Sequence, residues 1–99
     1  MTTDDTQRQP QTTWASAQSL LAADHAVVLW KPDCEFSAQL MEELKDHPAI
    51  TWVNVREDED ANARLRELND GNELTPTVLV GERVLRNPSA DELRAMLPS

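Results

Sequence analysis

The chain has 99 residues, with 18 acidic and 9 basic side chains and a formal net charge of −9 at pH 7. This length supports one domain with a single core of modest size, and the excess of carboxylates argues against nucleic acid or an anionic membrane as the partner. No apolar stretch is long enough to cross a bilayer, and the polar N-terminal residues lack the apolar core of a secretory signal, so we expect a cytoplasmic protein.

The chain begins with a polar stretch that is followed by a short amphipathic segment. Residues 1–11 contain almost no large apolar side chain, and we predict a disordered tail ahead of a single domain at residues 12–99. Thr12 or Thr13 can cap a helix that ends near Asp24. The apolar residues on one face of this helix are Trp14, Ala17, Leu20 and Leu21. The pattern leaves open whether the helix covers the sheet or serves a partner.

A buried strand and a second helix come next. Residues 26–30, AVVLW, form a continuous apolar run that is typical of a central strand buried on both faces. After Pro32, helical spacing recurs until His47 and Pro48 end the segment. The apolar residues of this second helix are Phe36, Leu40, Met41 and Leu44.

The second half of the chain repeats this alternation and then changes. Residues 51–55 predict a strand and residues 56–70 predict a helix that stops at a glycine. Two short strands follow at residues 77–80 and 83–85, and the Gly81-Glu82 pair between them predicts a hairpin.

The last helix starts after Pro88 and Ser89 and turns three apolar residues inward, namely Leu93, Met96 and Leu97. The predicted order is therefore an extra N-terminal helix followed by β-α-β-α-β-β-α. This order favours an α/β thioredoxin-like fold, in which a βαβ unit and a ββα unit share one four-stranded mixed sheet.

Cys34 is the only cysteine, and it lies between the first predicted strand and the following helix. Free backbone N–H groups and the helix dipole favour the thiolate there, and Lys31 adds a nearby cation. The carboxylates of Asp33 and Glu35 act in the opposite direction. We therefore expect a thiol pKa that is lowered only mildly. The alternative interpretation of Cys34 is a small buried hydrophobe at the start of a helix.

The two histidines have structural interpretations. His25 precedes a strand, and His47 lies at a helix C-terminus, where a cation is favourable. No cluster of cysteine and histidine has the spacing of metal ligands, so the sequence predicts no bound metal.

Two stretches of the sequence resemble the glutaredoxin family, and within it the mycoredoxins of actinobacteria. They are VVLWKPDCEFSAQL around the thiol and GNELTPTVLVGERVLRNPSADELRAML near the C-terminus. The resemblance implies a glutaredoxin-type fold and a disulfide reductase with Cys34 as its catalytic residue. It also implies a low-molecular-weight thiol, mycothiol or glutathione, as the co-substrate.

The resemblance further implies a binding site for this small thiol. A cis peptide at Thr75-Pro76 is expected beside the reactive thiol, where its backbone pairs with the bound compound. The turn that carries Asn87 and Ser89 is expected to hold the thiol compound at the start of the last helix. The full set of binding residues implied in this way is Phe36, Thr75, Pro76, Thr77, Asn87 and Ser89.

The chain departs from the mycoredoxins at one position. They carry CxxC, whereas this chain reads Cys34-Glu35-Phe36-Ser37, so the resolving thiol is absent. Ser37 can donate a hydrogen bond to a thiolate but cannot form a disulfide. We therefore predict a monothiol oxidoreductase in cell redox homeostasis, with Lys31, Glu35 and Ser37 tuning the thiol. Its expected partners are protein mixed disulfides and a small thiol, and we expect a monomer.

Two other functions are compatible with the sequence. The missing resolving cysteine and the acidic neighbours of the thiol are also expected of a thioredoxin-fold binding module without activity. Phe36-Ser37 also resembles the CGFS monothiol glutaredoxins, which carry an iron–sulfur cluster. Glu35 replaces the glycine of that motif, however, and the tryptophan-proline pair expected before the cis-proline is absent. A carboxylate beside an anionic cluster disfavours cluster assembly.

Overall fold

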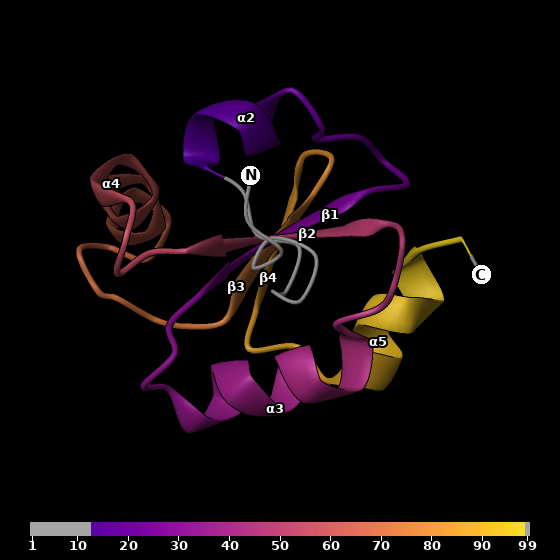
Figure 1. The fold of residues 1–99 in the computed structure, drawn as a ribbon. Coiled ribbons are helices and arrows are strands. Elements are labelled where there is room, and N and C mark those ends of the chain that lie inside the picture. The colour runs from indigo at the N-terminus through magenta and orange to yellow at the C-terminus, as the bar shows by residue number, and fades with distance from the viewer. Residues whose placement is uncertain (1–12, 99) are drawn as a thin grey trace, which may run out of the picture.

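The computed structural model describes residues 13–98, and Figure 1 shows how the helices and strands are arranged. In chain order the elements are α2 (Trp14–Gln18), β1 (Ala26–Trp30), α3 (Glu35–Leu44), β2 (Ile50–Asn54), α4 (Glu59–Leu68), β3 (Thr77–Val80), β4 (Arg83–Arg86) and α5 (Ala90–Met96). The four strands form one mixed sheet in the order β2-β1-β3-β4. β1 is parallel to β2 and antiparallel to β3, and β3 pairs antiparallel with β4. The predicted fold class, with its extra N-terminal helix, is confirmed.

Strand β1 lies at the centre of the sheet because all of its residues are apolar and buried. Its register places Val28 opposite Trp52 of β2 and Val78 of β3. Parallel strands need a crossover connection, and α3 carries the chain from the end of β1 to β2. The residues that follow β1 therefore lie at the end of the central strand, where α3 begins.

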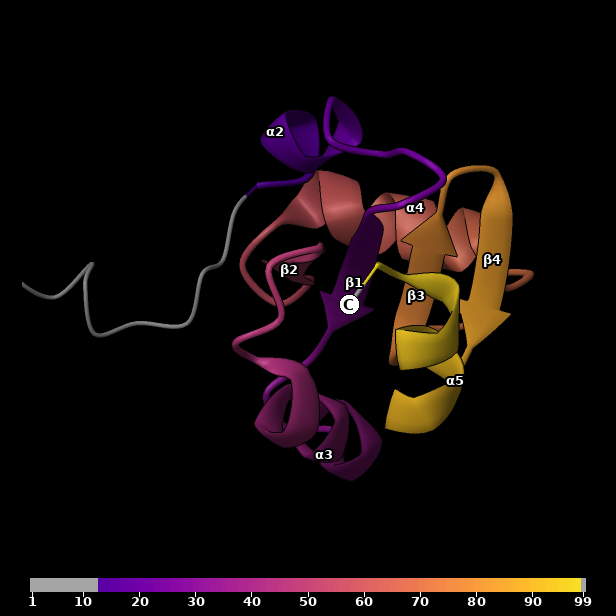
Figure 2. The same ribbon diagram turned by 90° about the vertical axis from the view of Figure 1, so that its right-hand side faces the viewer.

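Helices cover both faces of the sheet, as Figures 1 and 2 show. α3 and α5 lie against one face, and α2 and α4 lie against the other. Successive side chains of a strand point to opposite faces, so each strand contributes to both apolar clusters. The cluster under α3 and α5 includes Val28, Trp30, Leu40, Trp52, Val78 and Leu93. The cluster under α2 and α4 includes Trp14, Val27, Leu29, Val53, Ala61 and Leu65.

The N-terminal helix α2 is shorter than the sequence pattern predicts. Thr13 caps it, since the Thr13 side chain accepts a hydrogen bond from the N–H of Ser16. Trp14 is buried, but Leu20 is 46% exposed and does not extend the inner face as predicted. The helix stops at Gln18 because the hydroxyl of the next residue, Ser19, donates to the Ser16 carbonyl at 2.8 Å and competes with the helical pattern. The predicted tail, residues 1–11, lies outside the described residues.

Two further helix ends differ from the prediction. α4 begins at Glu59, later than the pattern predicts, because the side chain of Asp58 accepts a hydrogen bond from the N–H of Ala61 at 3.0 Å. α3 ends at Leu44, before the predicted stop at His47. Within residues 13–98, we find no helix that is both long and apolar enough to cross a membrane.

The predicted hairpin between β3 and β4 is confirmed, and Gly81 makes its turn. The φ of Gly81 is +60°, a region that is costly for residues with a Cβ atom. A Cβ atom at this position would also lie 3.3 Å from the Cα of Ala23. The hairpin turn therefore packs closely against the segment that follows α2.

Candidate active site

Cys34 lies at the junction of β1 and α3, as the sequence predicts. It is the N-cap residue of α3, with an extended backbone (φ −103°, ψ 120°), and its carbonyl accepts a hydrogen bond from the N–H of Ala38 at 2.9 Å. No side chain among residues 13–98 caps this helix end, so the N–H groups of the first turn are available to the sulfur. The thiol is half-buried. These are the conditions in which a helix N-terminus stabilises a thiolate.

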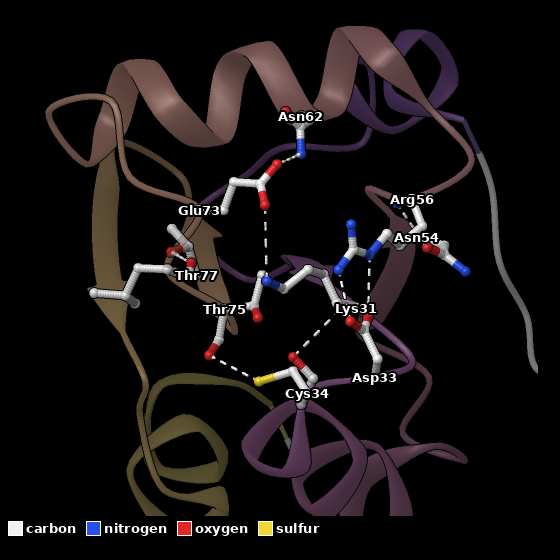
Figure 3. A network of polar contacts seen from close by, with 11 residues as sticks. Lys31, Asp33, Cys34, Asn54, Arg56, Asn62, Glu73, Thr75 and Thr77 are labelled. Carbon is white, nitrogen blue, oxygen red and sulfur yellow. Dashed lines mark hydrogen bonds and ion pairs between the residues drawn. The ribbon is translucent and has the colours of Figure 1, made fainter.

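The Cys34 thiol contacts the segment that precedes β3. Its Sγ donates a hydrogen bond to the main-chain oxygen of Thr75 at 3.4 Å (Figure 3). The Thr75–Pro76 peptide bond is cis, and both residues are buried. The hydroxyl of Thr75 is also buried, and it has no hydrogen-bond partner within the described part of the chain. Two segments that are distant in the sequence thus meet at the sulfur.

Several groups act on the pKa of the Cys34 thiol. Burial is the largest single effect and raises the pKa, because desolvation disfavours the thiolate. The side chain of Thr75 lowers it, as do the N–H and hydroxyl of Ser37 and the N–H of Phe36. The Thr75 carbonyl has the opposite effect to its hydroxyl, since it accepts the thiol proton and so stabilises the thiol. The balance holds the pKa of Cys34 below its ordinary value.

Ser37 occupies the position of the second cysteine in CxxC. Its side chain is fully buried, and its Oγ accepts a hydrogen bond from the N–H of Lys31 at 3.4 Å. The hydroxyl proton remains for the sulfur of Cys34 and lowers the pKa of that thiol. Ser37 therefore joins the β1–α3 connection to the reactive sulfur through hydrogen bonds.

Lys31 is paired with a carboxylate from another part of the chain. Its Nζ lies 3.8 Å from Oε1 of Glu73, in the loop between α4 and β3 (Figure 3). The other oxygen of Glu73 accepts a hydrogen bond from the side-chain amide of Asn62 at 2.7 Å. This amide and then Lys31 hold the pKa of the Glu73 carboxyl below its ordinary value. The charge of Lys31, which the sequence places near the thiol, is engaged by Glu73.

The acidic neighbours of Cys34 also have their own environments. Asp33 makes a bidentate ion pair with Arg56, with N–O distances of 2.6 and 3.1 Å. The hydrogen bond from this guanidinium holds the pKa of the Asp33 carboxyl below its ordinary value. Glu35 lies in the first turn of α3 and is exposed. The carboxylate of Asp33 is thus directed at Arg56, as Figure 3 shows.

A groove of about 380 Å³ lies between α3 and the start of α5. Phe36, two residues after Cys34, is 55% exposed and forms part of the wall. The remaining lining residues are Gln39, Leu40, Glu43, Asn87, Pro88, Ser89, Ala90, Asp91 and Glu92. The groove contains three of the predicted binding residues, namely Phe36, Asn87 and Ser89.

The turn between β4 and α5 is held by the chain's own hydrogen bonds. The N–H of Asn87 donates to the carbonyl of Pro76 at 2.8 Å, and Asn87 has a φ of +51°. Ser89 caps α5, because its hydroxyl accepts from the N–H of Glu92 while the Glu92 carboxylate accepts from the N–H of Ser89. The predicted binding turn is therefore joined to the cis-proline segment.

Thr77, like Thr75 and Pro76, is a predicted binding residue that does not line the groove. Its side chain is fully buried, and its hydroxyl donates to the carbonyl of Leu74 at 2.7 Å. The same hydroxyl accepts from the side-chain amide of Asn69, whose oxygen accepts from Nε of Arg86 at 2.8 Å. The Thr77 side chain thus supports the α4–β3 loop from the inside.

Sequence reasoning did not find three residues around the thiol. Glu73 and Arg56 pair with the charged neighbours of Cys34, and Asn69 supports Thr77; Arg56 and Asn69 belong to no motif that carries chemistry. The signal that was available for Glu73 is its place within the GNELTP stretch, two residues before Thr75. Within residues 13–98, no group of three or more histidine, cysteine, aspartate and glutamate side chains is placed to hold a metal ion.

Comparison with known proteins agrees with this geometry. The thioredoxin-like protein BC3987 and a single-site mutant of it have crystal structures that are 29% and 28% identical to this chain in sequence, each with a TM-score of 0.59. These matches cover 73% and 74% of this chain and 99% of the other. A thioredoxin from Malassezia sympodialis shares the fold at 19% identity and a TM-score of 0.50, over 86% of this chain and 84% of its own.

The sequence comparisons identify the family. No curated protein matches the sequence significantly. The sequence profile described as Glutaredoxin matches residues 26–85, a range that contains β1, Cys34, the cis-proline segment and most of β4. This range is more than half of the chain. The chain therefore belongs to the glutaredoxin family.

Proposed function

We propose that this protein is a monothiol oxidoreductase that reduces mixed disulfides between proteins and a low-molecular-weight thiol. Membership of the glutaredoxin family implies thiol–disulfide redox chemistry and a small thiol as co-substrate. The monothiol route follows from the single cysteine, and mycothiol as the small thiol follows from the resemblance to the mycoredoxins. The protein is proposed to act as a cytoplasmic monomer in redox homeostasis.

One observation carries the proposal. The half-buried sulfur of Cys34 faces the N-terminus of α3 and the cis-proline segment at once, and donors in the first turn of α3 together with the Thr75 side chain hold its pKa below the ordinary value. A thiol in this position is more often ionised near neutral pH than a free cysteine. The groove that Phe36, two residues after Cys34, shares with the start of α5 provides room for a small thiol.

The proposed reaction has two exchange steps. In the first, the Cys34 thiolate attacks the sulfur of the small thiol in the mixed disulfide, and the client protein leaves as a thiolate. In the second, a free small thiolate attacks the small-thiol sulfur of the new mixed disulfide. The small thiol is released as its own disulfide, and the Cys34 thiolate is restored. Overall, one free small thiol and the mixed disulfide give the reduced client thiol and the disulfide of the small thiol, so no second cysteine is needed at Ser37.

The residues of the site have distinct proposed roles. Ser37 and Thr75 stabilise the Cys34 thiolate through hydroxyl groups, since their side chains lower its pKa. Phe36 and Asn87 form walls of the groove that receives the small thiol. The buried Pro76 holds the Thr75 carbonyl against the sulfur, and its own carbonyl accepts from the N–H of Asn87.

The test uses a protein that carries mycothiol on a single cysteine as substrate, with free mycothiol as reductant. The full-length chain is expected to release the client thiol catalytically, and Cys34→Ser is expected to have no activity above the uncatalysed rate. Ser37→Ala is a useful companion variant, because it should retain turnover at a reduced rate. Turnover that survives Cys34→Ser would contradict the proposal.

Burial of the thiol favours a second candidate function, a binding module that retains the groove without the chemistry. Burial is the largest single effect on the Cys34 pKa, and it acts against ionisation. A thiol that titrates at or above the ordinary value for cysteine, about 8.5, together with no turnover, would establish this alternative. An iron–sulfur carrier is the third candidate, and visible absorbance after reconstitution with iron and sulfide would reveal it.

A further inference from the structure

The groove between α3 and the start of α5 has a one-sided charge. Three of its ten lining residues are acidic, namely Glu43 on α3 and Asp91 and Glu92 on α5, and none is basic. The rest of the lining is apolar or neutral. Phe36, Leu40 and Pro88 supply apolar surface, and Gln39 and Asn87 supply uncharged amides. A compound in this groove therefore meets carboxylates without a compensating cation from the lining.

The start of α5 does not offset these carboxylates. The N–H groups of Ser89 and Glu92 are already hydrogen-bonded within the capping box. Asp91 and Glu92 are both in the first turn, where they add negative charge at the helix end that an anion would approach. Two occupied donors and the like charge of these side chains therefore disfavour a carboxylate at this end of the groove.

The cations around the site are also engaged within the chain. Lys31 pairs with Glu73, and Arg56 makes a bidentate pair with Asp33. Figure 3 shows both pairs beside the thiol. Arg94, on α5, pairs with Asp91 at 2.9 Å. An incoming carboxylate would have to displace one of these partners to find a positive charge.

From these contacts we propose that the groove selects small thiols by charge, accepting uncharged or amine-bearing thiols and disfavouring those with carboxylates. This inference rests on the proposed function and names the substrate class of the same site. The physical cause is the negative potential of the groove, to which Glu43 and Glu92 contribute most because Asp91 is paired with Arg94; the described lining residues include no cation. Glutathione, which has two carboxylates, is the disfavoured type of thiol.

The test compares three small disulfides that differ in charge. They are glutathione disulfide, bis(2-hydroxyethyl) disulfide and cystamine, with anionic, neutral and cationic ends respectively. In each case the Cys34 thiolate displaces one thiolate and forms a mixed disulfide with the other half, and the rate is measured on the full-length reduced protein. Each rate is divided by the rate at which the reference thiol N-acetylcysteinamide reacts with the same disulfide, so that the intrinsic reactivity of the disulfide cancels. Cystamine is expected to be fastest, and glutathione disulfide about tenfold slower than the neutral disulfide.

Two matched double variants locate the effect. Glu43→Gln with Asp91→Asn removes two groove carboxylates, and Glu67→Gln with Glu82→Gln removes two carboxylates outside the groove. In the groove variant, the ratio of the exchange rate with the neutral disulfide to that with glutathione disulfide is expected to fall about threefold. In the control variant this ratio is expected to stay unchanged. An equal response in both variants would mean that only the net charge of the protein matters, and would overturn the proposal.

Alkylation separates this inference from the proposed function. Iodoacetamide and iodoacetate form the same kind of thioether, but only iodoacetate is charged. The rate with iodoacetamide divided by the rate with iodoacetate therefore reports the electrostatic potential at Cys34 without any disulfide. The ratio is expected to exceed that of N-acetylcysteinamide by several-fold and to fall as salt is added. Absence of disulfide exchange would refute the proposed function alone if this ratio remains high. A ratio equal to that of the reference thiol, or a faster reaction with the anionic reagents, would refute the charge selection.

Discussion

The side chains of Lys31 and Glu73 form an ion pair across the reactive end of the sheet, with 3.8 Å between Nζ and Oε1. Lys31 belongs to the β1–α3 connection that carries Cys34, and Glu73 belongs to the α4–β3 loop that carries Thr75. The pair joins the two segments that meet at the sulfur, and it engages a cation that would otherwise favour the Cys34 thiolate.

Replacing Glu73 by glutamine is therefore expected to increase the reactivity of Cys34. The amide keeps a polar group for Asn62 but no longer neutralises Lys31, so the pKa of Cys34 falls further and alkylation by iodoacetamide at pH 7 speeds up about twofold. Glu67→Gln, which removes a surface partner of Arg64, is the control and should leave the rate unchanged. A slower reaction in Glu73→Gln would show that the pair mainly holds the Thr75 loop in place.

Thr75→Val tests the buried hydroxyl beside the sulfur. Valine keeps the shape of threonine and removes the group that lowers the pKa of Cys34, so the pKa should rise and alkylation at pH 7 should slow about threefold. Stability at a pH where the thiol is protonated is not expected to fall, because the hydroxyl then has no hydrogen-bond partner among the described residues. Thr75→Ser retains the hydroxyl and should behave like the natural chain. Equal rates in the valine and serine variants would assign the pKa to the helix N-terminus alone.

Ser37→Cys restores the CxxC pattern and is expected to change the oxidised form of the protein. The Ser37 hydroxyl lies within hydrogen-bonding reach of Cys34, so a thiol at the same position can attack a mixed disulfide on Cys34. Mass spectrometry of the oxidised variant should show an internal disulfide with the small thiol lost. If the small thiol instead stays bound to Cys34 as a mixed disulfide, the buried position of residue 37 prevents the approach of the second sulfur.

The lowered pKa of Cys34 makes stability depend on pH. Between the folded pKa and the ordinary value, the folded chain holds a thiolate while the unfolded chain holds a thiol, so the unfolded state binds more protons. The contribution of Cys34 to stability is therefore fully present above the unfolded pKa and is lost as the pH falls through the folded pKa. Urea denaturation from pH 6 to 10 should show this rise in the natural chain relative to Cys34→Ser. Parallel curves would indicate equal pKa values in the two states.

Trp14→Ala tests whether the N-terminal helix belongs to the core. Trp14 is buried against α4 and the sheet, and its main-chain N–H, which alanine retains, donates to the Asp58 carboxylate at 2.7 Å. Its truncation is expected to lower the free energy of unfolding by about 3 kcal/mol without changing the pKa of Cys34. Leu20→Ala, at an exposed position just after the helix, is the control and should cost much less. An equally small loss of unfolding free energy in both variants would mean that α2 contributes little packing to the core.

Much of the fold was predictable from the sequence because each element depends on its own local pattern. The unbroken apolar run of β1 indicates a strand buried on both faces, and the structure buries all of it. The pair Gly81-Glu82 predicts the hairpin turn, which the structure makes with the positive φ of Gly81. Helix ends were less predictable. Asp58, for example, caps α4 and also binds the N–H of Trp14, a contact between segments that no local pattern contains.

The sequence by itself determined the position of Cys34, since a strand followed by a proline and an amphipathic segment places the thiol at a helix start. Only the tertiary structure decided which charges act on that thiol. Lys31 and Asp33 are near Cys34 along the chain, yet their charges pair with Glu73 and Arg56. The reason is that a long charged side chain takes its partner from whichever loop folds beside it, and the crossover topology brings the α4–β3 loop and the end of β2 to this edge.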